Sequence, residues 1–488
     1  MSHPGHHDSP AGDQGTAQDR YLSQDPAFPA RTIVGTLFMG AFFGYLNETL
    51  LNVALTPLMQ TFDIDRARVQ WLTTGFLLVM GGLTPITASI IRHASTRTVT
   101  LATLGTFLVG SLICAAAGSF ETLLAGRLVQ AASAALMVPL LMNAILTIYP
   151  PEKRGRAMAL VAMIFTLAPA IGPTLSGIIV DHLGWRALFL FALPFVLLAM
   201  GLTMRHLRVD LVPVDRPHID LPSALLAPAG FGGLVYAASE FASLSAGTFA
   251  LLLAGSLLLI ALFCHRQLRL QTPLLDLRAF AEPQFRLPAI ILGLSIFVFL
   301  GLELLLPMYM QQVLLFSGTL TGLVLLPASV AEAVTAPLAG ILLDRRGGRA
   351  VLLPGALLMV IGLGLLWWMA RPDVGALPMA LAFGLFGAAV AFAITGETHA
   401  MNTLPRPLHP HGTAIIATIN PVAGALGAAF FVGATGLGER WSDQPTPALA
   451  MQDGITLAFG LAVVIGVAVL MLATRIRPVG IQAPPPKP

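Results

Sequence analysis

The chain has 488 residues, of which 56% are hydrophobic and only 10% are charged. Soluble domains carry about 25% charged residues, so this composition excludes a soluble enzyme and indicates a protein that lies mostly within a bilayer. The formal net charge is +3, and the basic residues lie in short segments between apolar runs. This distribution excludes a nucleic-acid-binding protein. Cys114 and Cys264 lie inside apolar stretches, so we expect no disulfide framework, no metal site and no cofactor.

The chain begins with about 30 polar residues rich in Pro, Gly, Asp and His, which predict a disordered tail rather than a secretory signal. Fourteen apolar segments follow, each near the roughly 20 residues that a helical span requires. They lie at about 32–59, 69–92, 97–117, 121–148, 156–180, 186–204, 222–242, 247–264, 286–312, 318–342, 349–370, 375–399, 412–434 and 454–473. Transmembrane strands would instead alternate over about ten residues. The predicted fold class is therefore an all-α membrane protein.

The basic residues predict the orientation of these spans. If both termini are cytoplasmic, 21 of the 27 Lys and Arg residues fall in cytoplasmic segments and 5 fall outside. The remaining one, Arg127, lies within a span. Because Lys and Arg favour the cytoplasmic side, we expect a multi-pass protein of the inner or plasma membrane with both termini in the cytoplasm.

Two segments of the chain repeat each other. The segment from Pro85 to Arg97 aligns without gaps with the segment from Pro337 to Arg349, at an offset of 252 residues. Two six-helix halves separated by two additional helices would give this offset, and repeated halves that rock about a central cavity are a common transporter design. Chance similarity between two apolar helix ends is the alternative.

The repeat predicts five parts of the chain. They are a disordered cytoplasmic N-tail (1–30), an N-terminal six-helix bundle (31–204), cytoplasmic linkers with two inserted helices (205–285), a C-terminal six-helix bundle (286–475) and a C-tail (476–488).

The second copy of the repeat, residues 340–349 (GILLDRRGGR), resembles the cytoplasmic loop signature of the major facilitator superfamily. The resemblance implies two six-helix bundles and a cytoplasmic gate in which the aspartate holds a neighbouring helix end and basic residues bridge the halves. The implied gate residues are Gly340, Asp344, Arg345, Gly347, Arg349 and Arg97. In the first copy, Arg92 stands at the position of the aspartate.

Three further stretches narrow the resemblance. Residues 46–55 (LNETLLNVAL) resemble the pattern of the fourteen-span drug:proton antiporter family, although most members have an aspartate where Asn47 stands. Residues 168–177 (APAIGPTLSG) are similar to the antiporter signature of exporters, and residues 410–414 (PHGTA) are similar to the lincomycin-resistance branch. The resemblance covers roughly residues 30–475 and implies export.

Charged side chains inside a span are costly, by at least a few kcal/mol, and are therefore functional candidates. Glu48 lies near the middle of the first span and shares a helical face with Tyr45, Thr49 and Asn52. We expect this face to line the substrate cavity and Glu48 to take up and release a proton. A structural hydrogen bond to a neighbouring helix is the alternative.

The remaining charged candidates lie in later spans. Arg127 is expected to pair with an acid or with backbone carbonyls, and a static pair is the alternative to a proton-coupled one. Glu303, Glu332 and Glu397 are the acids of the second half, and each is either a coupling residue or a partner in an interhelical hydrogen bond. Tyr309 is a further candidate for the cavity wall.

The antiporter-like stretch contains two prolines and two glycines that we expect to form a tightly packed seam between the halves: Pro169, Gly172, Pro173 and Gly177. The alternative is an ordinary proline kink.

The predicted function is a proton-coupled secondary active exporter, an antiporter, of amphipathic or hydrophobic small molecules that works by alternating access. No GxxxxGK[ST] loop, HExxH or GxSxG motif appears, which argues against an ATP-driven pump and an enzyme. The alternatives are an exporter of one physiological solute, such as a lipid, siderophore or metabolite, and a channel or sensor. The expected partners are a small-molecule substrate, protons or Na⁺ and the lipid bilayer, without nucleic acid, and we expect a monomer.

Overall fold

The computed structural model describes residues 22–24, 28–212, 214, 220–241, 243–270, 273–371, 373–405 and 408–476. Within these ranges every regular element is a helix, so the predicted all-α class is confirmed. The predicted tails fall largely outside the described residues. The described part of the N-tail contains the short 3-10 helix η1 (Leu22–Gln24) and the first residue of α1, and only Ile476 of the C-tail is described.

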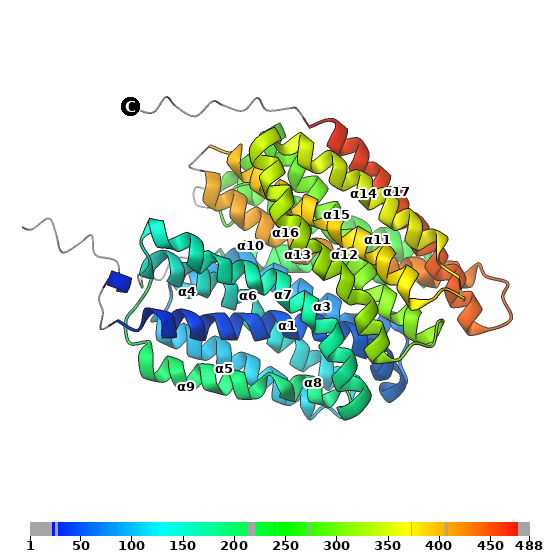
Figure 1. Ribbon diagram of the computed structural model, residues 1–488, viewed down its shortest axis with the longest axis horizontal. Helices are drawn as coiled ribbons and strands as arrows, with labels where there is room; N and C mark the ends of the chain where they lie inside the picture. Colours follow the sequence, from blue (N-terminus) through cyan, green and yellow to red (C-terminus); the bar gives the residue numbers. More distant parts are fainter. Residues whose placement is uncertain are drawn as a thin grey trace, which may run out of the picture.

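The helices from α1 to α9 pack together as one lobe, in the lower half of Figure 1. They are α1 (Ala30–Phe62), α2 (Arg66–Val69), α3 (Trp71–Leu83), η2 (Thr84–Ile86), α4 (Thr87–Ile91), α5 (Thr96–Ala115), α6 (Phe120–Ile148), α7 (Pro151–Leu183), α8 (Arg186–Phe191) and α9 (Leu193–His206). Two expected spans are interrupted. The breaks fall at Pro85 within η2 and just before Pro194, and each proline lacks the N–H that would donate to the preceding turn.

A second lobe and an inserted pair of helices follow. The pair consists of α10 (Leu221–Glu240) and α11 (Ala246–Arg269), with the 3-10 helix η3 (Leu277–Ala281) after it. The second lobe comprises α12 (Pro283–Gln312), α13 (Gly318–Arg346), α14 (Gly348–Trp368), α15 (Ala376–Asn402), α16 (His409–Arg440) and α17 (Pro447–Thr474). Several helices begin at a serine whose hydroxyl accepts the N–H three residues later, as at Ser95, Ser119, Ser245 and Ser317.

Thirteen helices in the described ranges are long and apolar enough to cross a membrane, whereas the sequence predicts fourteen spans. The difference is α1, which is long enough at 33 residues but carries Asn47, Glu48 and Asn52 in its middle. These side chains are 2–6% exposed, so neighbouring helices rather than lipid surround them. Thirteen helices therefore meet the length and composition of a membrane span. Helix α1 runs beside them in contact with α6, α7 and α9.

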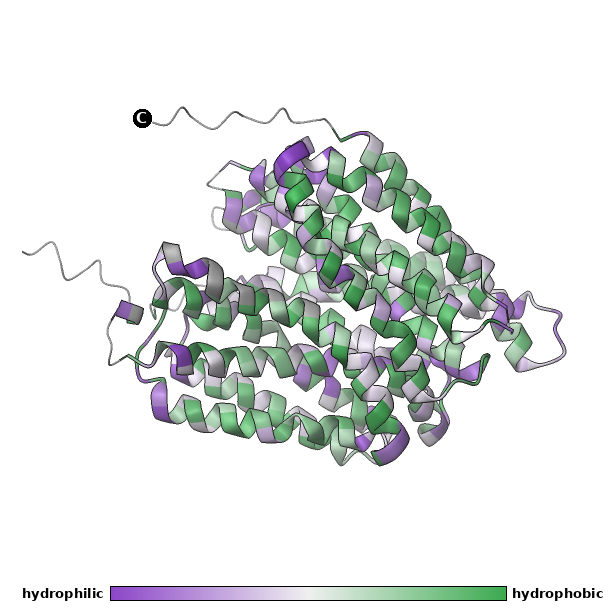
Figure 2. Ribbon diagram, viewed as in Figure 1, coloured by the Kyte–Doolittle hydropathy of each residue, from purple (hydrophilic) through white to green (hydrophobic). Residues whose placement is uncertain are grey.

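The helices run between two ends of the molecule. We call the end where α1 begins (Ala30) and α17 ends (Thr474) the terminal end, and the other the opposite end. Figure 2 shows hydrophobic residues along the lengths of the helices and hydrophilic ones gathered mainly where the helices turn. This pattern is expected when the helix ends face water and their sides face lipid or other helices.

The hydrophobic cores differ between the two ends. One core belongs to the first lobe alone and lies toward the terminal end, with Leu37 and Leu141 among its members. A second joins α10 and α11 to the terminal-end parts of α12, α15 and α16. The largest core crosses between the lobes, and the first lobe contributes to it only from mid-helix to the opposite end, as at Leu50 and Leu123. The lobes therefore share an apolar core toward the opposite end and have separate cores at the terminal end.

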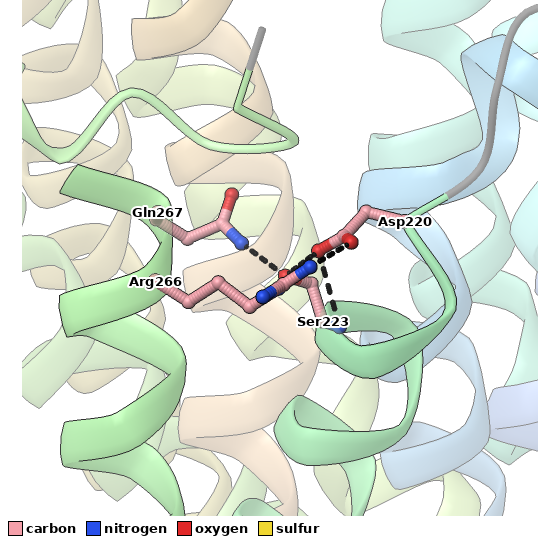
Figure 3. A network of polar contacts seen from close by, with 4 residues as sticks. All are labelled: Asp220, Ser223, Arg266 and Gln267. Carbon is pink, nitrogen blue, oxygen red and sulfur yellow. Dashed lines mark hydrogen bonds and ion pairs between the residues drawn. The ribbon is translucent and has the colours of Figure 1, made fainter. Parts of the chain in front are cut away.

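A polar network fastens α10 to α11 at the terminal end (Figure 3). Asp220 caps α10 by accepting from the Ser223 N–H at 3.3 Å, and Arg266 of α11 donates to both Asp220 oxygens, at 2.8 and 2.6 Å. Gln267 donates to the Ser223 hydroxyl at 2.6 Å. The hydrogen bonds from Arg266 lower the pKa of Asp220 from 3.8 to about 2.

Replacing Asp220 by Asn should lower the stability of the protein by about 1–2 kcal/mol, because the change removes an ion pair and weakens a helix cap. Since the pKa of Asp220 is lower in the fold than in the unfolded chain, its contribution is complete above about pH 4 and is lost as the pH falls toward 2. Thermal unfolding in detergent at several pH values measures both effects. Arg278→Gln is the control, because its side chain is 66% exposed. An equal effect of the two changes would contradict this account.

Candidate functional site

Three carboxyl groups from the two lobes lie near one another. Glu48 is on α1 of the first lobe, and its Oε2 is buried without a hydrogen-bond partner among the described residues. Glu303 is on α12 and is 4% exposed, and Glu332 lies half-buried at the middle of α13. Glu303 is close enough to interact electrostatically with both Glu48 and Glu332. The structure thus brings together three of the four acids selected from the sequence.

Neighbours on the predicted face of α1 complete this group. The Asn52 side chain lies beside the Glu303 carboxyl, so a residue of the first lobe meets one of the second. Tyr45 is within electrostatic range of all three acids, and its ring meets Phe165 edge-on with centroids 5.0 Å apart. We call Glu48, Glu303 and Glu332 the acid cluster.

Arg127 is fully buried beside this cluster and does not form an ion pair within the described residues. Its Nη1 donates to Asn47 Oδ1 at 2.5 Å and to Gln130 Oε1 at 3.0 Å, and its Nε donates to the Leu72 carbonyl at 3.3 Å. The guanidinium also lies over the Phe76 ring, 4.3 Å from its centroid. Of the two expected kinds of partner, an acid or backbone carbonyls, the described residues supply the carbonyls. The side-chain amides of Asn47 and Gln130, which were not expected, accept from the guanidinium as well.

The antiporter-like stretch of α7 packs against both α1 and α13. Gly172 lies against Thr49 of α1, whose hydroxyl is 3.4 Å from the Ala168 carbonyl. Toward the opposite end, Gly177 lies directly against the backbone of Gly318, and Pro173 lies against Gly322. Side chains at these glycines would overlap the neighbouring helix. Thr49, selected as a cavity residue, therefore lies in this contact.

Polar contacts join the two lobes at the opposite end. Asp181 at the end of α7 accepts from the backbone N–H groups of Gly318 and Thr319 at the start of α13, at 3.2 and 2.7 Å. Arg66 of α2 forms an ion pair with Glu439 of α16. Neither Asp181 nor Arg66 is among the candidate residues selected from the sequence. No local spacing identifies the Arg66 partner, which lies 373 residues away.

The residues of the implied cytoplasmic gate lie at the terminal end. Asp344, Arg345, Arg349 and Arg97 are exposed, and no ion pair joins them to one another within the described ranges. Gly347 ends α13 with a φ of 75°, a conformation that favours glycine. A side chain at Gly340 would meet nothing within 4 Å.

Two other candidates lie apart from the acid cluster. Tyr309 is buried, and its hydroxyl donates to the Arg371 carbonyl at 2.8 Å, near the end of α14 at the opposite end. Glu397 is half-buried five residues before the end of α15 at the terminal end. His399, on the same helix, is buried with its ring against Gly348.

The sequence matches the Major Facilitator Superfamily over residues 37–428 and 305–487. The chain belongs to this superfamily. The lincomycin resistance protein LmrB of Listeria monocytogenes is 37% identical over 414 residues, which cover 84% of this chain and 87% of the relative. The multidrug resistance protein B homologue of Mycobacterium tuberculosis is 29% identical over 86% of this chain and 79% of the relative.

A solved structure has the same fold. The bacterial homologue of the human lysosomal transporter Spinster superposes with a TM-score of 0.67 at 15% identity, covering 91% of this chain and 96% of that one. The chain is therefore a multi-span membrane transporter of the Major Facilitator Superfamily and not an enzyme.

Replacing Arg127 by Gln should destabilise this transporter by about 2–3 kcal/mol, because charge-assisted hydrogen bonds to buried acceptors are lost. We expect a lower melting temperature in detergent and a loss of transport. Arg68→Gln is the matched control, since the Arg68 side chain is 54% exposed and should tolerate the change. Equal melting temperatures for the two variants would show that the Arg127 contacts contribute little.

Gly177→Ala should cost about 1–3 kcal/mol, because the added methyl group overlaps the backbone of α13. Transport and thermal stability should both fall. Gly201→Ala serves as the control, because a side chain there would meet nothing within 4 Å and alanine favours a helix. If the two alanine variants behave alike, α7 and α13 are not in close contact in the working protein.

Proposed function

We propose that this transporter is a proton-coupled antiporter that exports amphipathic or hydrophobic small molecules by alternating access. The observation that carries the proposal is the acid cluster at the junction of the lobes, with Glu48 from one lobe and Glu303 and Glu332 from the other. A carboxyl group inside a membrane span is costly and typically serves an ion or proton pathway.

The cluster offers a physical link between protonation and lobe movement. Charges on Glu48, Glu303 and Glu332 repel one another, so bound protons or a bound cation stabilise the arrangement in which the two lobes bring the acids together. A movement that separates the lobes changes that repulsion. Protons and a cationic substrate would therefore compete for the same acids, and competition of this kind produces exchange.

The substrate class follows from the surroundings of the acids and from the relatives. Tyr45 and Phe165 supply aromatic surface next to the carboxyl groups, a combination that suits molecules with an apolar body and a positive charge. The relatives named for lincomycin and multidrug resistance support export of drug-like compounds.

We infer the orientation from charge and from the cores. Most basic residues lie in segments at the terminal end, which supports a cytoplasmic location for that end and for both termini. Because the cores that the lobes share lie from mid-helix to the opposite end, whereas each lobe has its own core at the terminal end, we infer that this conformation presents the site to the cytoplasm. In this scheme the two moving bundles are residues 31–204 and 286–475, and the inserted unit is 205–285. A single chain supplies both bundles, so the proposed transporter works as a monomer.

The gate and seam residues receive complementary roles in this scheme. Gly177 and Gly318 allow α7 and α13 to close the outer side. When the lobes rock, Asp344, Arg345 and Arg349 of the second lobe approach the terminal end of the first lobe, where Arg97 lies. Asp344 would then form ion pairs that it does not make with any described residue in this conformation.

The first test is ethidium transport in proteoliposomes under an imposed pH gradient, comparing wild type with Glu48→Gln. We expect the gradient-driven rate to fall by at least about tenfold, which corresponds to about 1.4 kcal/mol, while ethidium binding is retained. Glu240→Gln is the control, since that acid lies at the opposite end and accepts from Ser243.

The other outcomes separate the alternatives. Full activity of Glu48→Gln would remove Glu48 from the mechanism and leave Glu303 and Glu332 as candidates. If wild type responds to a Na⁺ gradient instead, the coupling ion is Na⁺. If wild type transports no compound of a drug panel, the exporter of a single physiological solute is favoured, and uncoupled flux would indicate a channel.

A further inference from the structure

Six neutral polar side chains are buried together on the opposite-end side of the acids. They come from α1, the junction of α2 with α3, and the end of α10, and each is at most 6% exposed: Asn52, Thr56, Gln70, Thr73, Thr74 and Ser239. We call them the polar cluster. The Thr73 hydroxyl donates to Asn52 Oδ1 at 3.4 Å, and the Gln70 amide donates to the Ser239 hydroxyl.

Three oxygen atoms of the polar cluster have no hydrogen-bond partner among the described residues. They are Oγ1 of Thr56, Oε1 of Gln70 and Oγ1 of Thr74. A buried polar atom without a partner destabilises a fold, and proteins usually satisfy such atoms with water. A site lined by several of them offers the two to four polar contacts that a buried water needs. Hydroxyl groups and waters both donate and accept, so together they can pass a proton along.

The polar cluster begins at the acids. Glu48, Asn52 and Thr56 follow one another at intervals of four residues, so they form one line along α1. Asn52 also lies beside Glu303. The contact between Asn52 and Thr73 sets the register of α1 against α3.

The polar cluster ends near the surface at the opposite end. Because α1 and α3 run antiparallel, Thr56 lies level with Gln70, one turn beyond the contact between Asn52 and Thr73. Arg66 lies one further turn toward the opposite end and pairs with Glu439 at the surface, where the two side chains are 18% and 23% exposed. The polar side chains therefore extend over about three turns from the acids to the outer surface.

Ser239 connects this cluster to the inserted helices. At the terminal end, α10 and α11 share a core with the second lobe, whereas Gln70 belongs to the first lobe. Val235, one turn before Ser239, packs between Leu77 of α3 and Ala425 of α16. The bond between Gln70 and Ser239 thus joins the first lobe to the inserted pair, and a movement that separates α3 from α10 would break it.

We propose that the polar cluster is the route by which protons from the outer side reach Glu303 and Glu48, and that α10 closes this route in the present conformation through Ser239. The ionisable groups that face the route are Glu48, Glu303, Glu332, Tyr45 and Arg127 at its inner end and Arg66 and Glu439 at its outer end. The inference rests on the proposed proton coupling and adds residues and a role for the inserted pair.

The test uses Thr56→Val and Thr74→Val in the full-length protein in proteoliposomes. Each change keeps the shape of the side chain and removes a hydroxyl that bonds to no other described residue, so a purely structural role predicts little effect. We expect ethidium transport driven by a pH gradient to slow about tenfold, while ethidium counterflow at equal pH and the melting temperature stay unchanged. Thr56→Ser, which keeps the hydroxyl, should restore the rate.

Two further variants sharpen the result. Thr321→Val is the matched control, because Thr321 on α13 also has a buried hydroxyl with no partner among the described residues but lies outside the polar cluster. Ser239→Ala removes the contact from α10 and should alter the dependence of the gradient-driven rate on external pH without changing counterflow.

Three outcomes would overturn the inference. The first is wild-type gradient-driven transport in both Thr→Val variants. The second is a parallel fall of gradient-driven transport and counterflow, which indicates a structural role. The third is a wild-type protein without any response to the pH gradient. Only the third outcome also overturns the proposed proton coupling, whereas the first two leave that coupling in place.

Discussion

Polar groups inside a membrane span must find partners within the protein, and the core of this transporter is arranged around that constraint. Arg127 is fully buried in a chain of which only 10% of residues are charged. Its guanidinium is held by Asn47, Gln130 and the Leu72 carbonyl, so three spans are fixed around one side chain. Glu48 lies next to Asn47 on α1 and is thereby held at the boundary between the lobes.

The two ends of the molecule differ because their contacts differ in kind. Toward the opposite end, the lobes share an apolar core, and Arg66 and Asp181 add polar contacts to the second lobe. At the terminal end each lobe has its own core, and the gate residues such as Asp344 are exposed. An interface that is closed at one end and separate at the other fits the alternating access proposed above, since a rocking motion closes one end as it opens the other.

The inserted helices have a dual attachment. The network of Asp220 and Arg266 fastens α10 to α11, and their core joins them to the second lobe. Ser239 nevertheless reaches Gln70 in the first lobe. Apolar contacts also join α10 to the first lobe, where Val235 packs with Leu77 and the ring of Tyr236 lies 6.1 Å from that of Trp71. The inserted pair therefore contacts both lobes.

The sequence alone determined the class of this protein. Composition and the spacing of apolar runs predicted a helical membrane protein, because a bilayer imposes the length and hydropathy of each span. Helix α1 is missing from the thirteen helices that are apolar enough to cross a membrane, because its polar face is covered by other helices. The same cost of burying charge identified Glu48, Glu303 and Glu332 as candidates. Tertiary structure alone decided which of them meet, why Arg127 binds amides and carbonyls, and that Arg66 and Asp181 join the lobes. The contacts from Arg127 to Leu72, from Asp181 to Thr319 and from Arg66 to Glu439 connect residues 55, 138 and 373 positions apart. No local pattern encodes a partner at such a distance, because it is fixed only when separate helices pack together.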